Sequence, residues 1–541
     1  MQYDNGGELL VAHLKSLGID TVFGIVSVHN LPLVEAVDRH LRFVPVRHEA
    51  TAVNAADGYG RARGSIGCAL TSTGTGAGNA AGSLIEALSA GTAVLHVTGQ
   101  VESQYLGSGR GFIHETKDQL GMLSAVSTYA ATVTSARDAG RVLREAGAAA
   151  LATPGGPASV EWPIDLQYAA QEDASEAVPS GEAPSPDAAE LVAAQALLAK
   201  SRRPLIWAGG GARHARSELA ALLEATGAGL LSSNSGRGSV PEDHPLVIGN
   251  FATNPAVRAL LADADVLVTI GTHFRSNETA DYNLKLPEAH IQIDADAAAL
   301  GRVYPVRHAL HAEAEAVLPA LTGAAVRADA DWSARVTAVR EEVRAALHDD
   351  IGPQAALCDA LAAALPRGAV IARDVTIPSS SWGNRLLPIH DPRANVFPRG
   401  GGIGQGLGMG IGAALARPDE PTVVIAGDGG LAVHFGELLT VAQERPRLTL
   451  IVFNDGGYGV LRNMQDKYGE RRSGVDLFTP DFGPLAAACA LPYARIAAPE
   501  EAAPVLEAAL ASDGPTLVEV DLAALGPMKN PFTPPVKIPT A

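Results

Sequence analysis

Thr422-Val-Val-Ile-Ala-Gly-Asp-Gly-Gly430 is a short apolar run that stops in a glycine-rich turn. Apolar runs of this length are typical of strands buried on both faces of a parallel sheet. The residues from Leu431 to Gln443 then predict a helix. Backbone amides at the turn and at the start of that helix have no partner within the helix, so they can bind a phosphate group. Gly-Asp-Gly also occurs as a plain turn, so this segment alone does not establish a site.

The next apolar run, Leu448 to Phe453, ends in Asn454-Asp455-Gly-Gly-Tyr458. Because a right-handed crossover places the two strands side by side, we expect Asp428 and Asp455 at the same carboxyl edge of a sheet. Mg²⁺ binds through one or two carboxylates together with phosphate oxygens. The two aspartates and the glycine turn therefore predict a site for a metal-bound phosphate.

The same alternation of short apolar runs and helical stretches continues along all 541 residues. It predicts an α/β fold of three doubly wound parallel-sheet domains, at residues 1–168, 188–322 and 350–541. A segment without periodicity, 169–187, predicts a linker, and 329–350 predicts a polar helical connection. The strand candidates are 21–25, 43–46, 67–71, 93–98, 158–162, 204–212, 265–271, 290–294, 369–373, 422–426, 449–454 and 516–520.

Composition and charge limit the partners. The 41 Lys and Arg against 59 Asp and Glu give a net charge of −18. Nucleic acids and anionic membranes require a dense basic face, so neither is an expected partner. The three cysteines lie far apart and match neither a disulfide framework nor a metal pair. The first 17 residues resemble neither a signal peptide nor a spanning helix, and we expect a cytoplasmic protein.

Glu49 stands between a strand candidate and a helix predicted for residues 50–63. A carboxylate at a helix N-terminus is favoured by the helix dipole alone. A carboxyl group in that position can also relay a proton. The residues alone leave both interpretations open.

These segments resemble the signature of thiamine diphosphate (ThDP) enzymes. Gly427-Asp428-Gly429, 24 further residues and Asn454-Asp455 are similar to the diphosphate motif of that family. The resemblance extends along the whole chain to the superfamily of acetolactate synthase, benzoylformate decarboxylase and benzaldehyde lyase. Its members carry a pyrimidine-binding, a central and a diphosphate-binding domain in this order. Asp455 is a departure, because many members have asparagine there; it keeps an oxygen ligand and adds a negative charge.

The resemblance implies ThDP and Mg²⁺ as cofactors. Glu49 would bind N1′ of the aminopyrimidine and relay a proton there. The metal ligands would be Asp428, Asp455 and the backbone oxygen of Gly457. Each site would lie between the first domain of one subunit and the third domain of its partner, in a homodimer or homotetramer.

The glycine loop Gly400-Gly-Gly-Ile-Gly404 aligns with the family's cofactor-supporting loop. Its Gly401 carbonyl would accept from the 4′-amino group, and Ile403 would hold the cofactor in a bent conformation. Asp374 and Thr376 would add contacts to the diphosphate. The implied cofactor-binding residues are Glu49, Asp374, Thr376, Gly401, Ile403, Gly427, Asp428, Gly429, Gly430, Asp455 and Tyr458.

Two loops of the first domain are implied to face the reactive carbon. His29 stands where benzaldehyde lyase also has a histidine. His114 begins a run, His-Glu-Thr-Lys-Asp-Gln119, that resembles ketoarginine decarboxylase-like members. Because histidine titrates near neutral pH, we expect His114 to donate the proton that completes decarboxylation and His29 to hold the carbinol oxygen. The predicted substrate contacts are Val28, Thr71, Val460 and Leu461.

Acidic residues in the same run allow two interpretations. Glu115 and Asp118 would either bind a cationic substrate tail or pair with Lys117 or Arg110 on a solvated loop. The sequence leaves both open.

The central part contains Trp207-Ala-Gly-Gly-Gly-Ala212, which resembles a dinucleotide turn. A full GxGxxG with a following acidic ribose ligand is missing, so NAD is not expected. FAD is not expected either, because the segment after Gly249 lacks the His-Gly-Thr pattern of flavin-binding members. We expect a vestigial FAD fold.

The predicted function is a ThDP- and Mg²⁺-dependent lyase that acts on 2-oxo acids. After loss of CO₂ it would release an aldehyde or join the remainder to an acceptor carbonyl, as acetolactate synthase does. An alternative is a benzaldehyde lyase-like carboligase that makes or cleaves 2-hydroxy ketones without decarboxylation. A Rossmann-type dehydrogenase and a noncatalytic homologue are further alternatives, which Glu49 disfavours. Thr71 and Asn277 replace the two histidines of benzoylformate decarboxylase, so aromatic 2-oxo acids are not the expected substrates.

Overall fold

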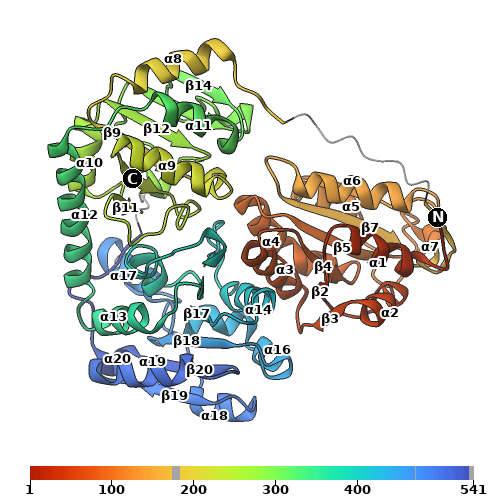
Figure 1. Cartoon of the computed structure of the whole chain (residues 1–541). Helices are drawn as coiled ribbons and strands as arrows, with labels where there is room; N and C mark the ends of the chain where they lie inside the picture. Colours follow the sequence, from red (N-terminus) through yellow and green to blue (C-terminus); the bar gives the residue numbers. More distant parts are fainter. Residues whose placement is uncertain (174–182, 470, 535–541) are drawn as a thin grey trace.

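Three six-stranded parallel sheets form the framework of the chain (Figure 1). The computed structural model describes residues 1–173, 183–469 and 471–534. The first sheet lies in the red-to-orange part of Figure 1, the central sheet in the yellow-to-green part and the third in the blue part. This architecture confirms the predicted α/β class with three parallel sheets.

The first sheet has the strand order β3-β2-β4-β5-β7-β6. Neighbouring residues on one strand enter different cores: Val22 packs in one hydrophobic cluster and Phe23 in another. Both faces of the sheet are therefore buried, which explains why its strands are continuous apolar runs. Its elements are α1 (Gly6–Ser16), β2 (Thr21–Gly24), α2 (Leu31–His40), β3 (Arg42–Pro45), α3 (Glu49–Arg63), β4 (Gly67–Thr71), α4 (Thr75–Ala90), β5 (Val94–Gln100), α5 (Gln119–Ala125), β6 (Tyr129–Thr132), α6 (Ala139–Leu151), β7 (Pro157–Pro163) and α7 (Ile164–Tyr168).

The central sheet has the order β11-β10-β9-β12-β13-β14. The order reverses direction between β9 and β12, which makes their carboxyl ends a topological switch point. Its elements are α8 (Ala188–Leu198), β9 (Pro204–Ala208), α9 (Arg216–Thr226), β10 (Gly229–Ser232), β11 (Val247–Gly249), α10 (Pro255–Asp263), β12 (Val266–Ile270), β13 (His290–Asp294), β14 (His308–His311) and α11 (Ala314–Ala324).

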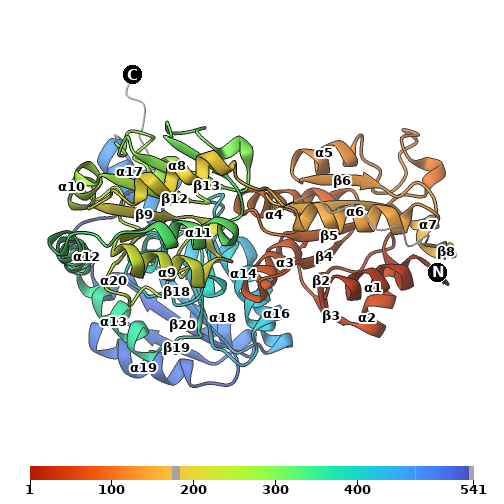
Figure 2. The ribbon, with the colours of Figure 1, turned by 45° about the horizontal axis from the view of Figure 1, so that its top comes forward.

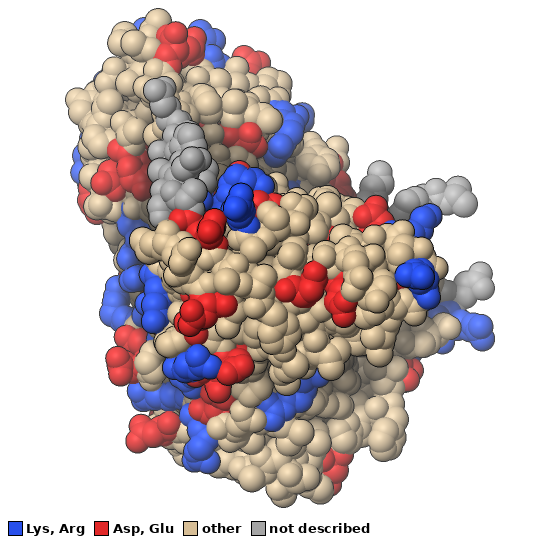
Figure 3. All heavy atoms as spheres, turned by 90° about the vertical axis from the view of Figure 1, so that its right-hand side faces the viewer, with Lys and Arg blue, Asp and Glu red and all other residues tan. Residues whose placement is uncertain are grey.

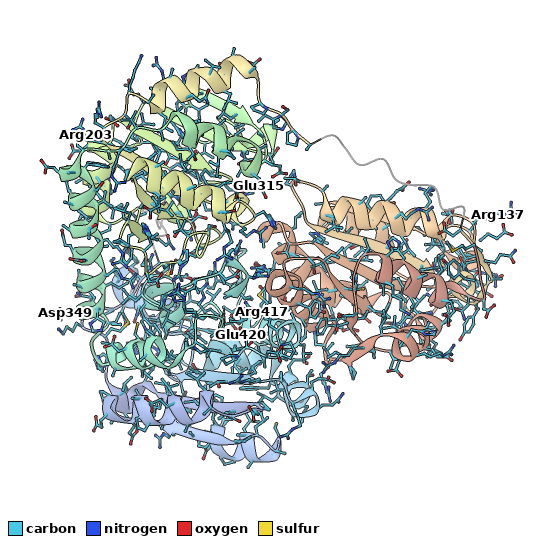
Figure 4. All side chains as sticks on the ribbon, viewed as in Figure 1. Arg137, Arg203, Glu315, Asp349, Arg417 and Glu420 are labelled. Atoms are coloured by element: carbon cyan, nitrogen blue, oxygen red, sulfur yellow. The ribbon has the colours of Figure 1, made fainter. Side chains whose placement is uncertain are left out.

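A long helix, α12 (Ala330–Asp350), connects the central and third sheets. In Figure 4, Asp349 marks the end of this helix on the outer side of the molecule. Arg203, which precedes β9, lies next to the start of the helix. Trp332 on this helix donates its indole N–H to the Pro204 carbonyl at 3.0 Å. The helix confirms the predicted helical connection at 329–350.

The third sheet has the order β16-β15-β17-β18-β20-β19. Strands β17 and β18 pair in parallel from Thr422 with Leu448 to Gly427 with Phe453. The elements are α13 (Ala355–Ala364), β15 (Val370–Arg373), β16 (Asn395–Val396), α14 (Gly406–Ala416), β17 (Thr422–Gly427), α15 (Asp428–Leu431), α16 (Glu437–Glu444), β18 (Leu448–Asn454), α17 (Gly459–Tyr468), α18 (Phe482–Ala488), β19 (Tyr493–Ile496), α19 (Ala502–Leu510), β20 (Thr516–Asp521) and α20 (Leu522–Leu525).

Two sequence predictions need correction. The single helix predicted for 431–443 is wrong, because a 3₁₀ turn at Ala432–His434 separates α15 from α16. The linker predicted from residue 169 begins too early, because β8 (Gln171–Glu172) still pairs with β1 (Gln2–Tyr3). Linker residues 174–182 lie outside the described part of the chain, and the exact domain boundaries stay a prediction.

Helices α3 and α14 bring the first and third domains together, and they lie side by side in Figures 1 and 2. Two glycines allow the backbones to touch: a Cβ on Gly58 would overlap the Met409 carbonyl, and one on Gly412 would overlap the Ala55 carbonyl. Nearby, the buried Arg61 guanidinium donates to the Phe397 carbonyl at 2.7 Å. The contact between the two domains is therefore made at backbone level.

Charges of both signs are interspersed over the face shown in Figure 3, and no continuous basic surface forms on it. This agrees with the charge balance of the sequence. Within the described residues, no helix combines the length and apolar character that a membrane span requires.

Candidate active site

The carboxyl ends of β17 and β18 bring Asp428 and Asp455 together, as the strand order predicts. Asp428 is the first residue of α15, and its carboxylate accepts from the Gly457 amide at 2.8 Å. The Asp455 amide lies 3.5 Å from the same carboxylate. The two aspartates thus belong to one pair of turns at the edge of the sheet.

Several glycines of these turns lie so close to neighbouring atoms that a Cβ would crowd them. A Cβ on Gly429 would lie 2.8 Å from the Gly457 carbonyl oxygen. A Cβ on Gly427 would lie 2.9 Å from Oγ1 of Thr376. Gly457 itself has a φ of 149° and faces the backbone of Val475. The result is a narrow cradle of backbone amides and carbonyls next to two carboxylates.

Electrostatics at the cradle fit a divalent cation. Burial, followed by the neighbouring Asp428 carboxylate, raises the pKa of Asp455 to about 6. Burial also raises the pKa of Asp428. The Asp455 Oδ1 atom is buried and has no hydrogen-bond partner among the described residues. A buried and a partly buried carboxylate, with one oxygen that makes no hydrogen bond, are stabilised by a cation, and Mg²⁺ takes its remaining ligands from phosphate and water.

Asp374 organises the glycine loop on the other side of the cradle. It is buried at the end of β15, and its carboxylate accepts from the Gly404 amide at 2.9 Å and from the Val375 amide at 2.7 Å. Burial raises the pKa of Asp374 to about 6. The structure thus gives Asp374 a scaffolding contact that the sequence did not reveal, and its contact with a diphosphate stays a prediction. Ile403 on the same loop is 39% exposed.

Glu49 is the first residue of α3, after the N-cap residue His48. The side chain of Asn79 donates to the Glu49 carboxylate at 3.0 Å. A Cβ on Gly76 would lie 2.8 Å from the other carboxylate oxygen, so a glycine at this position leaves space for the acid. No hydrogen bond or ion pair of the described residues joins this carboxylate to the third domain of the same chain.

His29 and His114 face each other across the neighbouring loops, with ring centroids 5.2 Å apart. His29 is 4% exposed, and its ring nitrogens make no well-aligned hydrogen bond among the described residues. Burial and then His114 lower its pKa, and the nearby Ile113 carbonyl opposes this shift. His114 adopts a left-handed backbone conformation with a φ of 67° and has an unpaired Nδ1. Two imidazoles without fixed partners are available for proton transfer.

Family models match each of the three domains in order. The N-terminal TPP binding domain of thiamine pyrophosphate enzymes matches residues 4–122, the central domain matches 191–321, and the C-terminal TPP binding domain matches 378–520. The chain belongs to the thiamine pyrophosphate enzymes. Thiamine pyrophosphate is another name for ThDP, so the match identifies the cofactor of the family, and the roles of the cradle and Glu49 toward it stay a prediction.

Curated relatives place the chain among the decarboxylases and acetolactate synthases of this family. A probable 2-ketoarginine decarboxylase of Pseudomonas aeruginosa is 33% identical over 95% of this chain and 93% of its own length. The acetolactate synthase isozyme 2 large subunit of Escherichia coli is 29% identical over 96% of both chains. A probable acetolactate synthase large subunit of Methanocaldococcus jannaschii is 28% identical over 97% of this chain and 93% of its own length.

The acidic residues of the His114 loop have structural partners in this ThDP enzyme. Glu115 accepts from the backbone amides of Gly109 at 2.9 Å and Gly111 at 3.1 Å. Asp118 caps α5 by accepting from the Gly121 amide at 2.7 Å. Among the described residues neither carboxylate forms an ion pair, so the predicted pairing with Lys117 or Arg110 is wrong, and binding of a cationic substrate tail stays a prediction.

The predicted substrate contacts divide into two groups. Val28 is 60% exposed, Leu461 is 48% exposed and Val460 is partly exposed. All three side chains are therefore accessible to solvent in the single chain. Thr71 is fully buried, and its hydroxyl pairs with His96 at 2.9 Å. A side chain held inside the sheet cannot contact a substrate, and we withdraw Thr71 from the predicted site.

A cavity of about 830 Å³ lies elsewhere, lined mainly by residues of the central and first domains. Gly210 and Gly211 after β9 line it, together with Arg213. Asp294, at the end of β13, lines the same cavity and has a buried oxygen, Oδ2, without a partner in the described chain. Asp294 is distant in sequence from the glycine turn, so it is not the acidic residue of a GxGxxG motif, and the sequence argument against that motif is unchanged. The expected absence of NAD and FAD stays a prediction, and for FAD it depends on the segment after Gly249.

Proposed function

We propose that the chain is a Mg²⁺- and ThDP-dependent lyase that decarboxylates a 2-oxo acid and then releases an aldehyde or transfers the remainder to an acceptor carbonyl. The observation that carries this proposal is the pair of unpartnered imidazoles of His29 and His114. Decarboxylation requires a proton donor after CO₂ has left, and a group that titrates near neutral pH can supply it. The acetolactate synthase-like and decarboxylase relatives support the same reaction class.

The cradle holds the cofactor in this proposal. Asp428, Asp455 and the Gly457 carbonyl would bind Mg²⁺, and the amides of Gly429 and Gly430 would bind the diphosphate. ThDP supplies the electron sink for cleavage of the bond to the carboxylate. The protein residues position this group and exclude water around it.

Glu49 and the two histidines would move the protons. Glu49 would exchange a proton at N1′ of the aminopyrimidine, with Asn79 fixing the carboxylate. His114 would protonate the carbon that has lost CO₂, and His29 would hold the neighbouring hydroxyl. In a benzaldehyde lyase-like reaction the same His29 would act without loss of CO₂, which is the second candidate function.

Each site would combine Glu49 of one subunit with the cradle of another. This proposal is supported by the lack of a polar contact between Glu49 and its own third domain. It is also supported by the apolar side chains that the isolated chain leaves exposed, namely Val26, Val28, Ile113, Ile403 and Leu461. A homodimer or homotetramer would cover them.

A substrate screen tests the reaction class. Purified protein with ThDP and Mg²⁺ is given a panel of aliphatic, aromatic and guanidinium-bearing 2-oxo acids, and CO₂ release is measured. The guanidinium compounds come first because one relative is a probable 2-ketoarginine decarboxylase. Cleavage of 2-hydroxy ketones without CO₂ release from any 2-oxo acid would favour the second candidate.

A further inference from the structure

Arg462 connects two pieces of backbone: the turn at Asp455 and Gly456, and residues 475–477, which pair with that turn and are called the covering segment below. Its guanidinium donates to the backbone carbonyls of Asp455 and Gly456, each at 3.2 Å. On its outer side it pairs with Asp476 at 2.8 Å. The side chain is 15% exposed, although it comes from α17, a helix without a fully buried residue. A long cation that is buried in this way has a specific role in the turn.

The same guanidinium lies 3.7 Å from Oδ1 of Asp455, the oxygen that has no hydrogen-bond partner. This distance is too long for a hydrogen bond, so the guanidinium and the carboxylate interact through their charges alone. Gly459, at the start of α17, leaves the space for this carboxylate, because a Cβ there would overlap it. Asp455 therefore points into a small region bounded by Asp428 and Arg462.

The charges of this region explain why a cation is needed. Asp428 and Asp455 contribute two negative charges, and the diphosphate that the proposed site receives is itself an anion. One Mg²⁺ does not neutralise this total. A fixed positive charge within 4 Å of Asp455 reduces the repulsion between the second carboxylate and the diphosphate.

We infer that Arg462 is a positioning residue that acts as the counter-charge of Asp455 and thereby allows an aspartate to serve as the second metal ligand in this enzyme. The inference rests on the proposed function, because it requires the diphosphate and Mg²⁺ to bind at this turn. Arg462 then makes two contributions that can be separated. It compensates the negative charge of Asp455, and it attaches the turn to the covering segment.

The burial of Arg462 also has a purely structural explanation, in which Arg462 only attaches the covering segment to the turn. The Tyr458 amide donates to the Val475 carbonyl and the Leu477 amide donates to the Gly456 carbonyl, both at 2.9 Å. These backbone bonds already hold the segment to the turn. If Arg462 only strengthened this attachment, its removal would have the same effect whether residue 455 were charged or neutral.

A double-mutant cycle distinguishes the two roles. The ThDP dissociation constant is measured by titration calorimetry at saturating Mg²⁺ for the wild type, Arg462→Met, Asp455→Asn and the double variant. We expect R462M to weaken ThDP binding about tenfold or more in the wild-type background, since loss of a partner from a partly buried charge pair is costly. In the D455N background the same change should weaken binding less than about threefold. Equal losses in both backgrounds, or no loss in the first, would overturn the inference.

Two controls keep the result interpretable. Asp476→Asn removes the outer ion pair and leaves the charge next to Asp455, so ThDP binding should stay near the wild-type value. Arg462→Lys keeps the charge and loses the bidentate geometry, so it should retain most of the affinity if charge dominates. Thermal unfolding of each cofactor-free variant checks that the fold is intact. If the wild type itself binds no ThDP in a Mg²⁺-dependent manner, the proposed metal site fails first, and that result is visible before any variant is compared.

Discussion

The Glu49 carboxylate, whose proposed role is proton transfer, has few neighbours in the described chain. It has one hydrogen-bond donor, Asn79, and lies against Gly76. No other hydrogen bond or ion pair of the described residues involves it, so the acid would be available to a cofactor held by the proposed neighbouring subunit. The amide of glutamine has the same shape but cannot exchange a proton with N1′.

Glu49→Gln should therefore keep ThDP bound and lower kcat about 100-fold or more, which is the range of a lost general acid–base group. Calorimetric titration gives the affinity, and CO₂ release on the active 2-oxo acid gives the rate. Asn79→Ala, which removes only the donor to this acid, is the milder comparison. Turnover close to the wild type with Glu49→Gln would contradict the proton relay.

The histidine pair leads to a pH-dependent prediction. Burial and the neighbouring His114 hold the pKa of His29 below the ordinary 6.5, so His29 is neutral at pH 7. Removing His114 removes one of the groups that lower the pKa of His29, so that pKa should rise. In His114→Gln the acidic limb of the kcat/KM profile should move to higher pH, and aldehyde release should fall about 100-fold. Full aldehyde release with an unmoved limb would show that His114 has neither role.

At the level of helices, the close approach of α3 and α14 depends on glycine. Gly58→Ala places a Cβ against the Met409 backbone, which cannot move away because it belongs to α14. We expect a loss of about 1–3 kcal/mol in stability and a lower Tm for the cofactor-free protein, because the packed backbones must separate. Gly78→Ala on α4 meets nothing within 4 Å and should be neutral or slightly stabilising. Equal melting curves for both variants would refute the tight contact.

The central domain carries the prediction about flavin. Its cavity is lined by the glycine turn after β9 and by Asp294, but the segment after Gly249 lacks the flavin-contact pattern. We expect purified protein to be colourless, and the supernatant of heat-denatured protein to contain neither FAD nor NAD by mass spectrometry. A stoichiometric yellow chromophore would require a different account of this domain.

Most buried strands were predictable from the sequence, although β10 inside the central sheet was missed, and of the edge strands only β3 coincides with a predicted run, 43–46. Strand β4 matches the run predicted for 67–71, because a strand buried on both faces must be apolar throughout. Strands β6, β14 and β19 lie at sheet edges and are partly exposed, so their sequences lack a continuous apolar run. The 3₁₀ break after α15 also escaped prediction, because apolar periodicity does not register a local change of hydrogen-bond pattern.

The site was predictable where topology dictates it. Asp428 and Asp455 meet because successive parallel strands are neighbours, and this needs no knowledge of side-chain packing. The roles of Glu115 and Asp374 depend on which backbone amides a folded loop presents, and residue type cannot show that. Thr71 failed because it lies on β4, an inner strand of the first sheet, where its side chain is completely buried.

At the level of the whole molecule, the proposed shared site predicts complementation. Glu49→Gln and Asp428→Ala inactivate different halves of each site. In a mixed dimer, one site receives both defects and the other receives none. Co-expression of the two variants should therefore recover part of the wild-type activity, while two different Glu49 variants together should recover nothing. Activity absent from a verified mixed oligomer would contradict a site shared between subunits.

The backbone contact between α3 and α14 also constrains recombination with relatives. A chimaera that takes residues 1–168 from one parent and the rest from another joins two helices that did not evolve together. Glycines at 58 and 412 alone would not suffice, because Arg61 must still find the Phe397 carbonyl across the same boundary. Gene-shuffling experiments should therefore exchange the first and third domains as one block.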